Sequence, residues 1–437
     1  MQDSILVKGQ LVWKDQSIIG YPAQVKITPL SNPEVIIMQK VDSIGRFEQL
    51  LPKGTYTFAP QLNYHWMEED WIRIDAQKST QQLKVKARGK NQITIQLDTI
   101  AWPAKPRRTR ILKSAAALNP QAIDAFIQDR MAFFEIPGAT LSIIDRDRII
   151  YNQVYGVTNA ETKQAVNHQT LFEAGSITKI VFAFAVMRLY ERREIDLDKP
   201  LYEYFEHQEI DDDRYKLITA RYVLSHQTGM ANWPRKDENG QFKLKFTPGT
   251  KYGYSGKAYE YLKEVVEKIT AKPIEVILQE EVLKPLNIKD MYFKGSDIIA
   301  TRGAHGHKKY VPSDIFLAKR TMVAYTLQTT SEAIAKFAIA MRQRKGLKQE
   351  TYDEMFKVHA ERSDGTKWGL GVRIEDTPEG ISYGHSGSTG RGFISNLVFY
   401  DEIGLGYTVL TNCQMGGWLS LPLLNEYLIT GQSDYGN

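Results

Sequence analysis

Ser176 and Lys179 form the only Ser-x-x-Lys motif in this chain of 437 residues, within FEAGSITKIVFAFAVMRL. Residues three positions apart lie on the same face of a helix, so the Lys179 amine can reach the Ser176 hydroxyl. The eight residues from Ile180 to Met187 have no polar side chain, which predicts a helix buried on nearly all sides. A lysine at the edge of such burial loses proton affinity. A pKa near neutrality requires a drop of about three units, or about 4 kcal/mol. The motif therefore predicts a serine activated by a neutral amine.

The same two residues also fit an interpretation without chemistry. Serine is a common helix N-cap, and a lysine one turn later can extend its ammonium to the surface while its methylene groups stay buried. The motif alone leaves both interpretations open.

Two later segments carry further residues of interest. In FTPGTKYGYSGKAYEYL, a Pro-Gly turn precedes Tyr254 and a segment with helical spacing. In YGHSGSTGRGF, a strand-like segment from Tyr383 to Phe393 contains four glycines. Glycine weakens a strand, so this choice indicates close approach by another backbone or by a ligand.

The elements that must position these residues divide the chain into two domains. Residues 1–105 contain short alternating runs separated by turn residues, which predicts a small antiparallel β-sandwich. AWPAKPRRTR then interrupts regular structure. Residues 112–437 begin with NPQAIDAFIQDRMAFF, a predicted helix with Asn119 as N-cap and Pro120 at its first position. The predicted hairpin ATLSIIDRDRIIYNQVYG follows, with its turn at Asp145 to Asp147. The chain then continues through helical segments and returns to strands near the end, before a closing helix. We expect the first and last strands to share one antiparallel sheet with helices around it, an α+β fold with a helical subdomain.

Composition excludes several classes of function. The net charge of +5 is small for this length, so we expect no nucleic-acid partner. No apolar run reaches the roughly 18 residues of a membrane span. The single cysteine, Cys413, excludes an intramolecular disulfide. His305 and His307 form an H-x-H pair, but lysines follow where further metal ligands are expected, so we predict neither a metal nor a cofactor.

Ser176-x-x-Lys179, Tyr254-Ser255-Gly256 and His385-Ser386-Gly387 follow one another in the order typical of one family. The chain resembles the penicillin-recognising serine hydrolases, in particular the class C β-lactamase-like branch of D,D-peptidases, D-aminopeptidases and esterases. The supporting text includes LFEAGSITK, VLSHQTGM, FTPGTKYGYS and GHSGSTGRGF, and the resemblance spans roughly residues 115–430. In the first domain, VDSIGRFEQLLPKGTYTF resembles the carboxypeptidase-regulatory-like, transthyretin-like sandwich domains.

The resemblance to the hydrolases implies specific roles. Ser176 becomes the acylated nucleophile, and Lys179 and Tyr254 share its proton, with the ammonium lowering the phenol pKa. The backbone N–H groups of Ser176 and Ser388 form the oxyanion hole. Gly387 lets the substrate lie along the glycine-rich strand as an extra strand.

Two positions depart from the β-lactamase pattern, and together they imply an ester, an amide or a short D-amino-acid peptide as substrate, with weak β-lactam hydrolysis at most. His385 replaces a lysine that pairs with the substrate carboxylate, which leaves a weaker anchor. Gly256 replaces an asparagine that contacts the acyl amide, which removes a hydrogen bond and opens space. Arg391 is a candidate substitute anchor, although a solvated surface arginine fits as well. Trp233 is a candidate residue of the rim.

Three functional hypotheses remain open from the sequence. The first is the serine hydrolase. The second is a protein that binds penicillin or cell-wall peptides with little or no turnover. The third assigns the main role to the N-terminal domain, as a tether to a partner or glycan. We expect a periplasmic or secreted location, with the leader absent from this chain, and leave a cytoplasmic location open. The sequence does not determine the oligomeric state or the physiological substrate.

Overall fold

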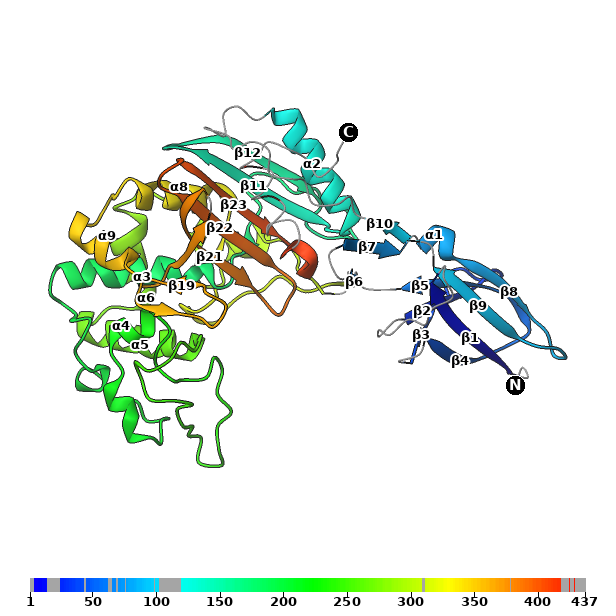
Figure 1. Ribbon diagram of the computed structural model, residues 1–437, viewed down its shortest axis with the longest axis horizontal. Coiled ribbons are helices and arrows are strands. Elements are labelled where there is room, and N and C mark those ends of the chain that lie inside the picture. Colours follow the sequence, from blue (N-terminus) through cyan, green and yellow to red (C-terminus); the bar gives the residue numbers. More distant parts are fainter. Residues whose placement is uncertain are drawn as a thin grey trace. The chain divides into compact units, whose positions relative to one another are not determined.

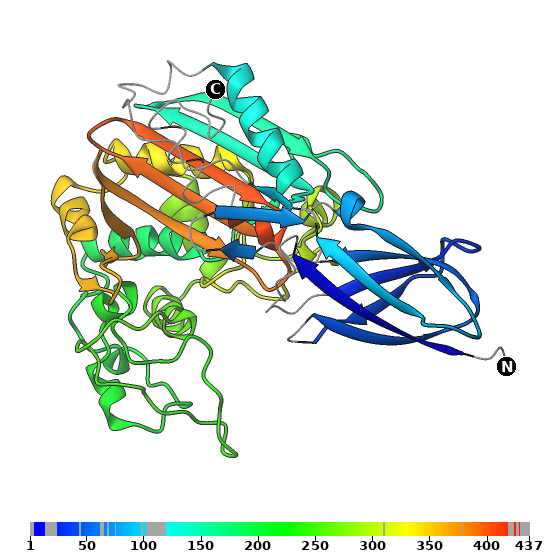
Figure 2. The same ribbon diagram turned by 45° about the vertical axis from the view of Figure 1, so that its right-hand side comes forward.

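The structure is a computed structural model that describes most of the second domain and parts of the first. The described residues are 4–13, 24–42, 45–61, 65–67, 70–74, 76–97, 99–101, 119–308, 311–377 and 379–417, together with 424 and 428. The chain divides into two compact units, one that ends at residue 107 and one that runs from 108 to 432 (Figures 1 and 2). The predicted linker and the helix predicted after the last strand lie almost entirely outside the described residues.

Two sheets of the N-terminal unit contribute to one core. One sheet has the order β4-β1-β9 and the other has the order β3-β2-β5-β8. Their strands are β1 (Ile5–Trp13), β2 (Gln24–Pro29), β3 (Ile37–Lys40), β4 (Arg46–Leu51), β5 (Gly54–Gln61), β8 (Gln81–Val85) and β9 (Gln92–Leu97). Alternation sets their inner faces: Ile93, Ile95 and Leu97 on β9 are buried while the residues between them are exposed.

The pairing in this unit differs from the sequence expectation at one place. β1 pairs antiparallel with β4 but parallel with β9, so the unit is not wholly antiparallel. Local alternation specifies which side chains face the core, but it does not specify the direction of a neighbour that is 80 residues distant in sequence. The likeness to carboxypeptidase-regulatory-like domains stays a prediction.

The second unit is built on one eight-stranded antiparallel sheet. Its order is β12-β11-β23-β22-β21-β20-β19-β18, so the first two strands of the unit lie beside the last ones, as predicted (Figure 1). The strands are β11 (Gly138–Asp145), β12 (Arg148–Gly156), β18 (Ala360–Glu361), β19 (Lys367–Trp368), β20 (Arg373–Thr377), β21 (Gly380–Ser388), β22 (Ile394–Tyr400) and β23 (Leu405–Thr411). The β11–β12 hairpin turns at the predicted place.

Helices cover this sheet and form the second layer. The longer ones are α2 (Pro120–Phe133), α3 (Ile177–Glu191), α5 (Gly256–Thr270), α8 (Ser331–Arg342) and α9 (Gln349–Phe356). Asn119 caps α2 and Pro120 begins it, as predicted. α8 packs against β11, β12, β22 and β23, whereas α3 packs against β21 and β22. Every residue of α3 from Ile177 to Met187 is buried, which confirms the expected all-round burial.

Candidate active site

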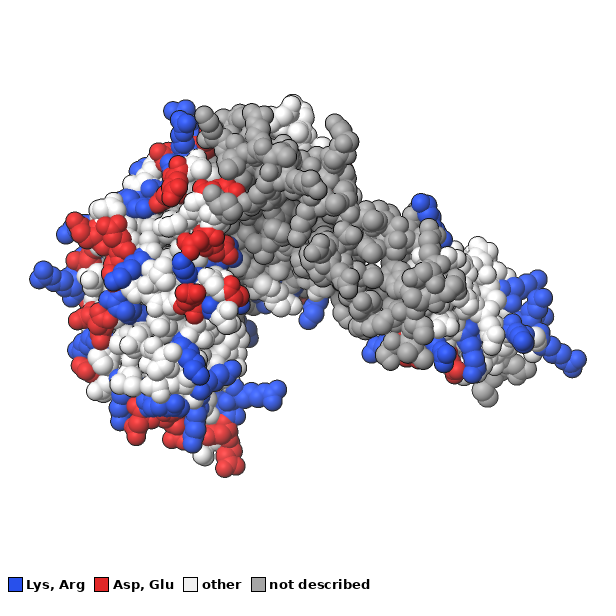
Figure 3. All heavy atoms as spheres, viewed as in Figure 1, with Lys and Arg blue, Asp and Glu red and all other residues white. Residues whose placement is uncertain are grey.

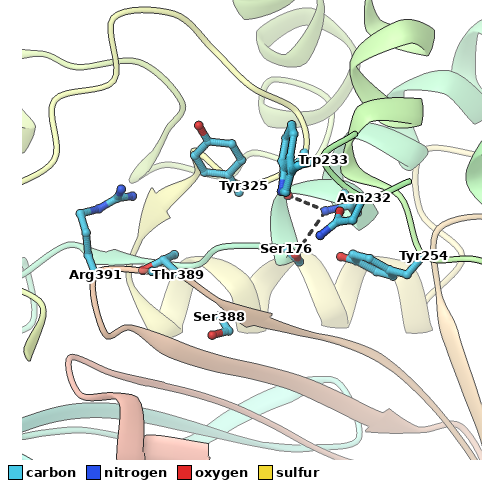
Figure 4. Close-up of a pocket in the computed structure, with 11 residues that line it drawn as sticks. Ser176, Asn232, Trp233, Tyr254, Tyr325, Ser388, Thr389 and Arg391 are labelled. Atoms are coloured by element: carbon cyan, nitrogen blue, oxygen red, sulfur yellow. Dashed lines mark hydrogen bonds between the residues drawn. The ribbon is translucent and has the colours of Figure 1, made fainter. Parts of the chain in front are cut away.

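Ser176 lies at the start of α3, immediately before its first residue. Its side chain makes no capping hydrogen bond, so the interpretation of Ser176 as a simple N-cap is wrong. Lys179 does not extend to the surface either, because only 2% of it is exposed. Its Nζ donates to the Ala324 carbonyl at 2.6 Å and lies 3.2 Å from Ser176 Oγ (Figure 4, dashed lines). The structure therefore brings the two residues of the motif together in a dry setting.

Burial controls the charge of Lys179. Loss of solvation lowers the pKa of this amine to about 7, while the carboxylate of Glu260 acts in the opposite direction. Near neutral pH a large fraction of Lys179 is then uncharged. An uncharged amine keeps an N–H on the Ala324 carbonyl and offers its lone pair to the Ser176 hydroxyl. This is the arrangement that a general base requires.

Tyr254 completes the group from the other side of the pocket. It lies two residues before α5, and its ring centroid is 4.9 Å from Lys179 Nζ. Burial raises the pKa of Tyr254 to about 12, and a hydrogen bond with Ser176 opposes this only in part. The expectation that the ammonium lowers the phenol pKa is therefore wrong, because desolvation of the phenolate dominates. Tyr254 is a protonated hydroxyl at neutral pH, so of these two groups only Lys179 can accept a proton there.

His226 supports Tyr254 from behind. Their ring centroids are 4.2 Å apart, and His226 Nδ1 accepts a hydrogen bond from the Ser255 backbone N–H. Burial, followed by the nearby Lys179, holds the pKa of His226 well below its usual value. A neutral His226 ring is therefore packed against the phenol of Tyr254.

The turn before Ser176 packs closely against the end of the glycine-rich strand β21. Gly175 has φ +52°, and a Cβ on it would lie 2.9 Å from the Ser388 backbone nitrogen. The backbone of Ser388 is thus adjacent to the nucleophile turn, and both Ser176 and Ser388 line the pocket. This placement fits the expected pair of oxyanion-hole donors.

Gly387 has a different reason to be glycine from the one expected. A Cβ at this position would lie 2.0 Å from the Ala174 carbonyl oxygen. The missing side chain therefore makes room for the protein's own chain before Ser176, and Gly387 does not line the pocket. Pairing of a substrate with β21 stays a prediction.

The pocket around Ser176 has a volume of about 350 Å³, within the size range of small-molecule sites. Figure 4 shows Tyr254 at one end, Arg391 at the other, and Trp233 with Tyr325 above Ser176. The lining residues come from α3, from three loops and from the end of β21: Ser176, Lys179, Asn232, Trp233, Tyr254, Ala324, Tyr325, Ser388, Thr389, Gly390 and Arg391.

His385 does not occupy the pocket, which corrects its expected role as a substrate-binding residue. It is 1% exposed, its ring packs on Trp368, and Nδ1 donates to the Ser386 carbonyl. Burial, and then the nearby Lys179, lower the pKa of His385 to about 3. A buried neutral ring cannot hold a substrate carboxylate by charge.

Gly256 does not open space in the pocket, contrary to expectation. A Cβ at Gly256 would lie 2.9 Å from the Trp233 ring and 3.1 Å from Asn232 Oδ1. Asn232 Oδ1 accepts a hydrogen bond from the Gly256 N–H at 2.7 Å, which directs the oxygen to the backbone and leaves the amide nitrogen for the pocket. Trp233, expected at the rim, does line the pocket and is 51% exposed.

Arg391 lines the pocket but is already paired. Its Nε donates to Glu173 Oε1 at 2.7 Å, and a second bond joins Nη2 to Glu173 Oε2. Its guanidinium also lies 3.6 Å from the centroid of the Phe316 ring. Both interpretations of Arg391 from the sequence, a free anchor and a solvated surface residue, overlook this bidentate pair.

Several residues of the site were not identified from the sequence. Glu173 lies in the segment FEAGSITK, so its proximity to Ser176 was a usable signal. Ala324 and Tyr325 had no such signal, because they come from a loop about 150 residues away. Among the described residues, no group of three or more His, Cys, Asp or Glu side chains is placed to hold a metal ion.

Residues 123–418 match the family described as Beta-lactamase, which covers more than half of the chain. The chain belongs to the beta-lactamase family. Among its relatives in this family is esterase EstB of Burkholderia gladioli, 26% identical over 223 residues, which are 42% of this chain and 57% of EstB. Another is Protein flp of Staphylococcus aureus strain MW2, 22% identical over 206 residues, which are 44% of this chain and 41% of that protein. The chain thus spans about half the length of these relatives.

Solved structures show the same fold. The octameric penicillin-binding protein homologue from Pyrococcus abyssi matches with a TM-score of 0.64 and 22% identity, over 72% of this chain and 78% of that one. D-alanine carboxypeptidase AmpC from Burkholderia cenocepacia matches with a TM-score of 0.59 and 19% identity, over 68% of this chain and 95% of that one. The family of this chain therefore has esterases and carboxypeptidases among its members and structural neighbours.

Proposed function

We propose that this chain is a serine hydrolase that forms an acyl-enzyme on Ser176 and cleaves an uncharged ester, an amide or a short D-amino-acid peptide, with weak β-lactam hydrolysis at most. The observation that carries the proposal is the 3.2 Å separation of Ser176 Oγ from a buried Lys179 Nζ whose pKa lies at about 7. A serine hydroxyl with a neutral amine in hydrogen-bond range is an activated nucleophile.

The acylation step follows from this geometry. As Ser176 Oγ attacks the substrate carbonyl carbon, its proton moves to Lys179 Nζ. The negative charge on the carbonyl oxygen is stabilised by the backbone N–H groups of Ser176 and Ser388, each worth about 3–4 kcal/mol. The carbonyl then re-forms, and the bond to the leaving group breaks. The leaving oxygen or nitrogen takes a proton from the Tyr254 hydroxyl, which regains one from Lys179.

Deacylation uses the same groups in the reverse sense. A water molecule replaces the leaving group and gives one proton to the Tyr254 oxygen as it attacks the acyl carbon, while Tyr254 passes its own proton to Lys179. Ser176 Oγ recovers a proton and departs. No group outside the described pocket is needed for this balance.

The charges of the pocket support an uncharged substrate. Lys179 and Arg391 are the two basic side chains that line it. Lys179, with a pKa of about 7, loses its charge as the pH rises above neutrality, and Arg391 is neutralised by Glu173. A substrate carboxylate would lose its hydration without gaining a free cation, which disfavours penicillins and peptide C-termini.

The position of Asn232 favours a substrate that has an amide or ester oxygen beside the scissile bond. The family asparagine at position 256 is absent, but the Asn232 amide lies beside the same place and its Oδ1 is held by Gly256. Its Nδ2 is then directed to the pocket as a donor, which restores a contact of about 1 kcal/mol.

Incubation with p-nitrophenyl butyrate and with a fluorescent penicillin, followed by intact-mass measurement, tests the proposal. We expect sustained p-nitrophenol release, an acyl adduct on Ser176, and slow or no penicillin turnover. Ser176→Ala should abolish release and adduct, whereas the exposed-serine control Ser363→Ala should behave as the wild type. Equal adduct on Ser176→Ala would reject the proposal.

The same experiment distinguishes a hydrolase from the alternative of a binding protein with little or no turnover. A burst of acylation without subsequent turnover would favour a protein that captures penicillin or cell-wall peptides.

A periplasmic or secreted location, and a tethering role of the N-terminal unit, stay predictions. Among the described residues, no helix combines the length and apolarity that a membrane crossing requires. On the face of the second unit seen in Figure 3, basic and acidic side chains are intermixed.

A further inference from the structure

Glu260 is a buried carboxylate behind the pocket that the mechanism above does not use. It lies on α5, six residues after Tyr254, and is 4% exposed. A buried carboxylate is costly unless it has partners. Its Oε1 accepts a hydrogen bond from the Ala324 backbone N–H at 2.9 Å. Among the described residues its Oε2 has no hydrogen-bond partner, and it lies 3.4 Å from Lys263 Nζ, one turn later on the same helix.

Ala324 connects this carboxylate to the proposed base. Its N–H binds Glu260, and its carbonyl accepts the 2.6 Å hydrogen bond from Lys179 Nζ. The residue is fully buried and lines the pocket beside Tyr325. Glu260 therefore fixes the backbone segment that holds Lys179 against Ser176.

We propose that Glu260 is a positioning residue of this site, which holds Ala324 against Lys179. Its buried negative charge sets how readily Lys179 takes up a proton. Lys263 weakens the effect of that charge. This inference rests on the proposed function for its kinetic consequences, but its structural part stands on the hydrogen bonds alone.

The other groups around Lys179 do not supply a charge in the relevant pH range. Tyr254 and Tyr259 lie 4.9 and 5.6 Å from Nζ by their ring centroids, and burial raises the pKa of both phenols. His226 and His385 have pKa values lowered by burial and are neutral. Glu260 is the group that raises the Lys179 pKa, and Lys263 lies beside it on α5 and opposes the rise that burial causes in the pKa of Glu260.

The pair gives two variants with opposite expected effects. Glu260→Gln keeps an acceptor for the Ala324 N–H but removes the negative charge, so Lys179 should lose its proton more easily. Lys263→Met leaves the Glu260 charge uncompensated, so Lys179 should hold its proton more strongly. We expect the acidic limb of kcat/KM to move about one pH unit down in the first variant and up in the second. Glu332→Gln, on the distant helix α8, is the matched control.

The closing experiment has two readouts. The first is the pH dependence of p-nitrophenyl butyrate hydrolysis by wild type, Glu260→Gln, Lys263→Met and Glu332→Gln, with melting temperatures to confirm folding. The second is NMR titration of ¹³Cε-labelled lysine, with the Lys179 signal assigned by its loss in Lys179→Met. This second readout works without any enzyme activity, so failure of the proposed function and failure of this inference are distinguishable.

Opposite displacements of the limb and of the Lys179 titration support the inference. A loss of activity that is equal at every pH, with the acidic limb of kcat/KM unchanged, would show that Glu260 has only a packing role. That result would overturn the inference. If Glu260→Gln does not fold, Lys263→Met decides: an unchanged Lys179 titration in that variant overturns the inference.

Discussion

The α-carbon of Gly175 packs against the backbone of Ser388, so that a Cβ on Gly175 would lie 2.9 Å from the Ser388 nitrogen. This contact joins the turn that carries Ser176 to the strand that carries Ser388, although the two residues are far apart in sequence. The proposed oxyanion hole would therefore depend on a glycine next to Ser176.

Gly175→Ala is expected to lower kcat at least 100-fold, because the methyl group pushes Ser388 away from the developing charge. The left-handed φ of +52° adds strain for any residue with a Cβ. Steady-state kinetics with p-nitrophenyl butyrate measure the effect. Gly417→Ala, where a Cβ meets none of the described residues within 4 Å, is the control. Full activity of Gly175→Ala would show that Ser388 N–H does not contact the reacting oxygen.

The rate is expected to fall tenfold per pH unit as the pH drops below about 7. Only the unprotonated Lys179 accepts the Ser176 proton, and its pKa of about 7 places the loss on the acidic side. Tyr254, with a pKa of about 12, and His385, with a pKa of about 3, do not titrate between pH 5 and 9. A kcat/KM profile over this range, corrected with Ser176→Ala, should show one acidic limb. A rate that still rises tenfold per pH unit up to pH 9 would contradict Lys179 as the base and point to a group of higher pKa, such as Tyr254.

Glu173→Gln is expected to make the pocket accept carboxylates. It leaves Arg391 with an unbalanced positive charge, worth about 1 kcal/mol or about fivefold to an anionic substrate. The measurement compares kcat/KM for p-nitrophenyl hydrogen succinate with that for neutral p-nitrophenyl butyrate. The preference should return to the wild-type value in the double variant Glu173→Gln/Arg391→Met. An unchanged ratio in the single variant would mean that Arg391 does not face the substrate.

Gly256→Asn is expected to lower ester hydrolysis rather than to create a β-lactamase. The new side chain meets the Trp233 ring at 2.9 Å and displaces Asn232 from its bond to the helix N-terminus. Hydrolysis of p-nitrophenyl butyrate and of a chromogenic cephalosporin measures both activities. Adding Trp233→Ala removes the clash and should restore part of the ester activity. A gain in cephalosporin turnover by Gly256→Asn alone would contradict the packing argument.

Local chemistry in the sequence was enough to find the reactive group. Ser176 and Lys179 are three residues apart on one helix, and helix geometry brings such side chains together whatever the rest of the chain does. The apolar run from Ile180 to Met187 predicted the burial that lowers the Lys179 pKa. Alternation of apolar residues likewise predicted the β11–β12 hairpin and its place in a sheet shared with the last strands.

The tertiary structure alone decided what surrounds that group. Arg391 is paired with Glu173 across 218 residues of sequence, and Ala324 reaches Lys179 from a distant loop. The space beside Gly256 is filled by Trp233 and Asn232, and His385 is buried instead of facing the substrate. Hydrogen bonds and packing between segments depend on how the chain crosses itself, and spacing along one segment carries no information about that. The pairing of Ser176 with Lys179 is therefore local, whereas the charge and shape of the pocket around them are set by long-range contacts.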